Sequence, residues 1–138
     1  YETAAITHPI DRDIAALPGG QRQRVWLALA LAQDTPVLLL DEPTTFLDPA
    51  HAISVLQLVR KQADAGKTVV VVLHDLMLAG QYSDTMVVMN NGEVIAQGTP
   101  RQALRKEVLA AAYGIDVEIW DDPRSDAPVI VPRGVLSD

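Results

Sequence analysis

Two short runs of aliphatic residues stand out in the pattern of hydrophobic and polar positions along this chain. The first run covers 37–40 and the second covers 69–73, and neither contains an alternating polar residue. Uninterrupted aliphatic runs of this length are typical of strands that are buried on both faces of a parallel sheet. We therefore predict two buried strands, the first ending at Asp41 and the second ending at His74.

The segment between the two runs has the features of a helix. Asp48 is a good N-cap, Pro49 suits the first helical position, and Gly66 suits the C-terminal cap. Apolar residues recur at helical spacing in this segment, namely Ile53, Leu56, Val59 and Ala63. A strand, a helix and a strand with short connections predict a βαβ unit, with parallel strands and a right-handed crossover.

The pattern after this unit predicts further small elements. Asn-Asn-Gly at 90–92 separates two apolar runs, which is a strong signal for a β-hairpin. Thr99 can cap a helix that begins at Pro100, and this helix would carry three apolar residues on one face: Leu104, Val108 and Leu109. Two β-prone runs at 117–120 and 129–131 flank a polar, turn-forming stretch. These runs predict a C-terminal β-hairpin.

Composition narrows the classes of function. The 138 residues carry a formal net charge of −7, which argues against nucleic acid as a partner. The chain has no cysteine, so it has neither a disulfide framework nor a thiolate metal site. Its apolar runs fall well short of the roughly 20 residues that a membrane helix needs. Any contact with a membrane is therefore expected to go through a partner protein.

Candidate catalytic residues follow the two predicted strands. Asp41 and Glu42 end the first strand, and His74 ends the second. Neighbouring strands lie about 5 Å apart, and the carboxyl ends of parallel strands form the edge where open α/β sheets bind ligands. A carboxylate pair and an imidazole at this edge can hold a metal-bound phosphate, position a water and take its proton. The alternative interpretation is that these polar residues only solvate the strand ends.

A second candidate site precedes the first strand. Pro18, Gly19 and Gly20 lead into a segment, 21–33, that is made almost wholly of good helix formers. A Gly-Gly pair lets bare backbone N–H groups at a helix N-terminus approach an anion, and the helix dipole adds attraction. The alternative interpretation is a flexible loop before a core helix.

The combination of these motifs resembles the ATP-binding cassette (ABC) ATPases. The segments that carry the resemblance are LPGGQRQR at 17–24, LLLDEPT at 38–44, LD at 47–48, and His74. The sequences of these segments are most similar to those of cassettes from bacterial importers for iron-siderophore, haem or cobalamin-type cargo. The resemblance implies a P-loop NTPase fold, here a partial α/β cassette with a parallel βαβ core, flanking helices and a C-terminal β-hairpin.

The resemblance also implies roles for the residues at the strand edge. Asp41 would be the Walker B acid that organises Mg²⁺, and Glu42 would be the general base for the attacking water. His74 would be the switch histidine that contacts the γ-phosphate of ATP. Asp48 would be the D-loop acid at the boundary between two cassette subunits.

The resemblance also implies a nucleotide-binding role for the Gly-Gly loop. Gly19, Gly20 and Gln21 would belong to the signature loop, which in this family covers the ATP held by the opposite subunit. Pro18 stands where the family usually has serine, and proline supplies neither a hydroxyl nor an N–H group. We therefore expect this half of the nucleotide site to be weakened.

A larger departure is that no P-loop motif, Gly-x-x-x-x-Gly-Lys-Ser/Thr, occurs among the 138 residues. Gly66, Lys67 and Thr68 match only its last three positions, and they close a helix where a P-loop would open one. We expect the P-loop, the aromatic residue that stacks on adenine, and the Q-loop to lie before residue 1.

The sequence as a whole predicts an ATP-hydrolysing subunit of an importer for iron-siderophore or similar metal-chelate cargo, present as an incomplete cassette. The expected divisions are the end of the helical subdomain at 1–33, the second half of the ATPase core at 34–104, and a C-terminal extension at 105–138. The expected partners are a second cassette or the missing P-loop half, and a permease at the cytoplasmic face of the bacterial inner membrane. The alternative is a non-catalytic module that lends its signature loop to a partner.

Overall fold

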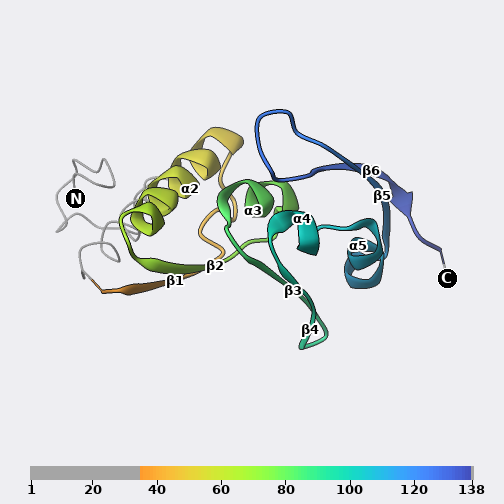
Figure 1. Cartoon of the computed structure of the whole chain (residues 1–138), viewed down its shortest axis with the longest axis horizontal. Helices are drawn as coiled ribbons and strands as arrows, with labels where there is room; N and C mark the ends of the chain where they lie inside the picture. Colours follow the sequence, from red (N-terminus) through yellow and green to blue (C-terminus); the bar gives the residue numbers. More distant parts are fainter. Residues whose placement is uncertain (1–34, 138) are drawn as a thin grey trace. The chain divides into compact units, whose positions relative to one another are not determined.

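A computed structural model describes residues 35–137 of the chain (Figure 1). The chain divides into two compact units between His74 and Asp75. The Gly-Gly loop and the helix predicted over 21–33 lie outside the described residues.

The described part of the first unit is a βαβ unit. Strand β1 (Val37–Asp41) pairs in parallel with strand β2 (Thr68–Val72), and helix α2 (Pro49–Asp64) connects them (Figure 1). The order of the elements and the parallel pairing confirm the prediction. The register places Asp41 opposite Val72, so both strands end at the same edge.

Helix α2 begins and ends as its sequence predicts. The Asp48 side chain accepts a hydrogen bond from the backbone N–H of His51, Pro49 occupies the first turn, and Gly66 follows the C-cap with a φ of 108°. The buried face differs in part from the expected one, because Ile53 is exposed. The residues that α2 buries are Ala52, Val55, Leu56 and Val59.

The prediction that both faces of the sheet are buried is wrong for this chain. Leu38 is only 5% exposed, and Leu40 packs against the cluster formed by Val55 and Val59 of α2. On the opposite face, Leu39 is 72% exposed, and three valines of that face are also exposed: Val37, Val70 and Val72. Among the described residues one helix covers this two-stranded sheet, so only one of its faces has a covering layer.

The second unit begins with helix α3 (Leu76–Tyr82), followed by strands β3 (Met86–Asn90) and β4 (Glu93–Gly98). The two strands pair in antiparallel fashion, which confirms the predicted hairpin. Asn91 and Gly92 connect them with φ values of 52° and 78°. A two-residue turn with two positive φ angles matches the right-handed twist of the strands, and asparagine and glycine adopt it at little cost.

The helix predicted from Pro100 is two helices. Helix α4 (Pro100–Ala103) ends at Leu104, and helix α5 (Lys106–Tyr113) follows after Arg105, whose backbone is extended. Neither Leu104 nor Arg105 is a helix breaker, so tertiary packing explains the interruption better than local preference does. The break places Leu104 and Leu109 in the same core, where they are 1% and 0% exposed.

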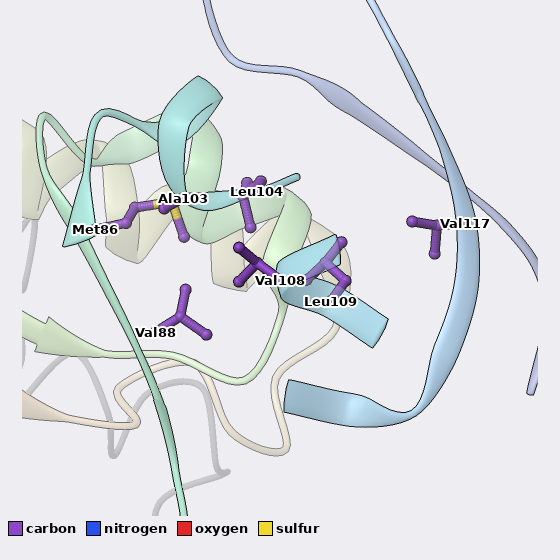
Figure 2. Close-up of a cluster of buried hydrophobic side chains, with 7 residues drawn as sticks. All are labelled: Met86, Val88, Ala103, Leu104, Val108, Leu109 and Val117. Carbon is purple, nitrogen blue, oxygen red and sulfur yellow. The ribbon is translucent and has the colours of Figure 1, made fainter. Parts of the chain in front are cut away.

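Strands β5 (Ile115–Trp120) and β6 (Val129–Val135) form the predicted C-terminal hairpin. Figure 2 shows the core cluster of this unit, which joins side chains of β3, α4, α5 and β5. Its members are Met86, Val88, Ala103, Leu104, Val108, Leu109 and Val117. Gly80 lets α3 approach this cluster closely, because a Cβ there would lie 3.0 Å from Leu104 Cδ1.

Candidate functional site

The backbone at the end of β1 positions Glu42. Asp41 is the last residue of the strand, and the Glu42 N–H donates a hydrogen bond to the carbonyl oxygen of Val72 at 2.9 Å. Glu42 then turns the chain out of the strand with a φ of 52°. This left-handed conformation costs a non-glycine residue on the order of 1–3 kcal/mol, and such residues concentrate at functional sites.

Glu42 and His74 contact each other across the edge formed by β1 and β2. His74 Nε2 lies 2.5 Å from Glu42 Oε1, although the two residues are 32 positions apart in the chain. A carboxylate oxygen can only accept, so with Glu42 ionised the imidazole carries its proton on Nε2 and donates it. This is the juxtaposition that the βαβ geometry predicts.

The second carboxylate oxygen of Glu42 also has a partner. Thr45 Oγ1 lies 3.4 Å from Glu42 Oε2, and the Thr45 N–H donates to the Glu42 carbonyl oxygen at 3.3 Å. The loop after the strand therefore folds back on Glu42. The Glu42 side chain is 38% exposed and the His74 side chain is 77% exposed, so both groups remain accessible to a ligand.

Asp41 directly precedes Glu42 at the end of β1 and is exposed. Within residues 35–137, no group of three acidic or histidine side chains is arranged to hold a metal ion. Mg²⁺ does not need such a group, because it usually binds only one or two protein carboxylates. Phosphate oxygens of the substrate and water molecules then complete its octahedral coordination. Asp41 is therefore the carboxylate at this edge that could hold an ion arriving with a phosphate ligand.

Asp48 lies at the far end of the loop that starts at Glu42, and its partner is His51. The carboxylate oxygen Oδ1 is 2.8 Å from the backbone nitrogen of His51 and 2.8 Å from its ring nitrogen Nδ1. These hydrogen bonds, the backbone one foremost, hold the pKa of the Asp48 carboxyl below its usual value. The ionised cap thus stabilises the helix above the usual titration range of aspartate, and this contribution is lost as the pH falls through the lowered pKa.

The remaining candidate residues, Gly19, Gly20 and Gln21, lie outside the described residues, as does Pro18. Sequence reasoning missed two polar contacts at this site, those of Thr45 and His51. His51 stands three residues after the N-cap, a spacing at which side chains commonly reach back to the cap. Thr45 has no comparable signal, since its contact depends on the left-handed turn at Glu42.

Known proteins provide a comparison with this site. A family model described as ABC transporter matches residues 2–45, a range that includes Asp41 and Glu42. The achromobactin transport ATP-binding protein CbrD of Dickeya dadantii is 50% identical over 90% of this chain and 46% of its own length. The iron(3+)-hydroxamate import ATP-binding protein FhuC of Bacillus subtilis is 46% identical over 98% of this chain and 51% of its own length.

A solved structure, an inward-facing conformation of a metal-chelate type ABC transporter, matches with a TM-score of 0.82 and 28% sequence identity. The match covers 96% of this chain and 53% of the solved chain. The chain thus spans about half the length of the curated relatives it matches.

Proposed function

Because this chain belongs to the ATP-binding proteins of ABC transporters, we propose that it supplies one edge of the ATP-hydrolysing site in an importer of iron-siderophore or similar metal-chelate cargo. The observation that carries the proposal is the contact between Glu42 and His74 at the carboxyl ends of two parallel strands. The cargo class is supported by the names of the relatives, which specify achromobactin transport and iron(3+)-hydroxamate import.

In this proposal Glu42 takes the proton of the water that attacks the γ-phosphate of ATP. Its Oε1 accepts a hydrogen bond from His74 and its Oε2 contacts Thr45, so the carboxylate is held in place before substrate arrives. A positioned carboxylate of this kind contributes to catalysis as a general base. Asp41 would hold Mg²⁺, and the bound ion would neutralise charge on the phosphates.

His74 has two acceptors available to it in this mechanism. Its Nε2 contacts Glu42 in the structure, and a γ-phosphate oxygen would compete for the same proton. When His74 donates to the phosphate, Glu42 Oε1 becomes available to accept from the attacking water. The exposed position of His74, 77% for its side chain, is consistent with this exchange of partners.

We propose that the exposed face of the β1–β2 sheet is covered by a P-loop-bearing segment. That face presents four apolar side chains to solvent, namely Val37, Leu39, Val70 and Val72, and the 138 residues contain no P-loop of their own. The relatives are about twice as long as this chain. Proteins of this kind therefore have further residues that can supply both a P-loop and a layer over this sheet face. A layer over four apolar side chains of one sheet face would gain several kcal/mol, at about 25 cal/mol per Å² of apolar surface removed from water.

The other proposed partners are a second cassette subunit, with Asp48 at the boundary, and an integral membrane permease. Within residues 35–137, no helix combines the length and the hydrophobicity that a membrane span requires. In this proposal the chain lies at the cytoplasmic face of the bacterial inner membrane, held there through the permease, and the transport and import functions that the names of the relatives state support this location.

A non-catalytic module is the second candidate function. Two features of the sequence favour it: the absence of a P-loop motif and the proline at position 18, where the family usually has serine. In that case the chain would lend its Gly19-Gly20 loop to the ATP of a partner, and Glu42 would not act as a base. Adding a P-loop-bearing half separates the two candidate functions. The ATP-hydrolysing function requires that hydrolysis be restored, whereas the non-catalytic module does not require it.

The proposal predicts that the 138-residue chain alone releases phosphate from Mg²⁺-ATP only at the background rate. The chain has a base and a histidine at the strand edge but no P-loop to hold the β- and γ-phosphates. A coupled assay for released phosphate at millimolar ATP checks this expectation. Turnover above background that disappears in Glu42→Gln would contradict it.

A further inference from the structure

The turn after β1 places the hydroxyl of Thr45 beside the carboxylate of Glu42. The Thr45 N–H donates to the Glu42 carbonyl oxygen at 3.3 Å, which closes a β-turn over residues 42–45. Pro43 occupies the second position of this turn, where the fixed φ of proline is favourable. The backbone hydrogen bond ends on the carbonyl oxygen and does not restrain the Glu42 side chain. The orientation of the carboxylate therefore depends on its side-chain contacts.

The two oxygens of the Glu42 carboxylate have different partners. His74 Nε2 lies 2.5 Å from Oε1, and the Thr45 hydroxyl donates to Oε2 at 3.4 Å. Thr45 belongs to the same turn as Glu42, whereas His74 follows the other strand and has a side chain that is 77% exposed. A movement of His74 toward another acceptor would therefore leave the Thr45 contact in place.

The contact of Thr45 with Glu42 is long for a hydrogen bond between oxygens. Hydrogen bonds of residues that take part in catalysis are often long before substrate binds, and they shorten in the substrate complex. The short contact to His74 holds the carboxylate on the side of Oε1. Once His74 releases Oε1, the carboxylate can approach the Thr45 hydroxyl.

We propose that Thr45 is a positioning residue that anchors Oε2 of Glu42, so that Oε1 is the oxygen that accepts the proton of the attacking water. This inference rests on the proposed function, in which His74 leaves Oε1 for the γ-phosphate. In the hydrolytic step the water oxygen bonds to the γ-phosphorus, the bond from phosphorus to the ADP oxygen breaks, and the water proton goes to Oε1. Without the Thr45 hydroxyl, the Glu42 side chain would sample several rotamers once His74 had left.

The test compares Thr45→Val with Thr45→Ser in the chain mixed with a P-loop-bearing half of a related cassette. Valine keeps the shape of threonine without the hydroxyl, and serine keeps the hydroxyl. Thr45→Val is expected to lower kcat for ATP roughly threefold to tenfold with KM unchanged, the size of one lost hydrogen bond. Thr45→Ser should keep kcat within about twofold of the wild type. The matched control is Thr35→Val, which removes a hydroxyl that donates to the Val37 carbonyl oxygen at the opposite end of β1 and should leave kcat unchanged.

Combination with Glu42→Gln separates positioning of the base from a general effect on the fold. If Thr45 acts through Glu42, adding Thr45→Val should change the residual rate of Glu42→Gln by less than about twofold. An equal loss of rate in both backgrounds would overturn the inference. A kcat for Thr45→Ser as low as that of Thr45→Val would overturn it as well.

A readout in the 138-residue chain alone does not depend on hydrolysis. His74→Ala removes the partner of Oε1 and imitates the state in which His74 has left. Three-bond NMR couplings of the Glu42 side-chain protons should then still indicate a single rotamer, because Thr45 holds Oε2. Adding Thr45→Val should produce rotamer averaging, while the thermal unfolding temperature stays within about 2 °C of that of His74→Ala.

Rotamer averaging already present in His74→Ala, or a single rotamer in both variants, would overturn the inference. A wild-type mixture that does not hydrolyse ATP would contradict the proposed function instead. In that event the couplings still decide whether Thr45 anchors the Glu42 side chain.

Discussion

Replacing Glu42 with glutamine is expected to lower kcat for ATP by about a hundredfold to ten-thousandfold, the contribution typical of a general base. The substitution is made in the chain mixed with a P-loop-bearing half. Glutamine keeps the size of the side chain, and its amide oxygen can still accept from His74 Nε2, 2.5 Å from the carboxylate in the wild type. The only function lost is the ability to take a proton from water.

The measurement is phosphate release at saturating Mg²⁺-ATP, with ATP binding followed in parallel. Glu93→Gln is the matched control, because it makes the same chemical change at an exposed residue of β4 in the second unit. This control should leave kcat unchanged. If Glu42→Gln kept more than half of the wild-type rate, another group would have to accept the proton and the assignment of Glu42 as the base would be wrong.

Truncating Leu109 to alanine is expected to lower the free energy of unfolding of the second unit by about 2–5 kcal/mol. Leu109 is 0% exposed and lies in the core cluster that Figure 2 shows. Its removal costs the transfer free energy of the lost methyl groups and leaves a cavity among side chains from β3, α4 and β5. Because domains are stable by only about 5–15 kcal/mol, this is a large fraction of the total.

Urea unfolding followed by circular dichroism measures this change. Leu136→Ala is the control, because the same atoms are removed from a side chain that is 46% exposed. We expect it to cost less than about 1 kcal/mol. Equal costs for the two variants would mean that Leu109 is not in a closely packed core.

The architecture near the site could be predicted from sequence because few interactions determine it. Two aliphatic runs on either side of a capped helix are compatible with few arrangements other than a parallel βαβ unit. Asn91 and Gly92 between two apolar runs are likewise compatible with few arrangements other than a β-hairpin. Once the strands are parallel neighbours, residues that follow them must meet at one edge. The contact of Glu42 with His74 follows from this geometry, and the match to a solved metal-chelate type transporter confirms the fold class.

Other features could not be predicted, because they depend on packing beyond the local pattern. Whether a β1 residue such as Leu39 is buried depends on a second layer, and no described residue provides that layer. The break between α4 and α5 places Leu104 in the core, although no residue there disfavours a helix. The left-handed turn at Glu42 is likewise set by its surroundings, since glutamate has no preference for positive φ.

The central claim is that this chain carries the hydrolytic edge of an ATPase site whose phosphate-binding residues lie elsewhere. The most direct test is to titrate the wild-type chain with a separately expressed P-loop-bearing half of a related cassette and to measure phosphate release from Mg²⁺-ATP. The account predicts no hydrolysis by either half alone, and hydrolysis that rises and saturates as the two are combined. If the halves form a stable complex that binds ATP and releases no phosphate, the claim is contradicted and the chain acts as a non-catalytic module.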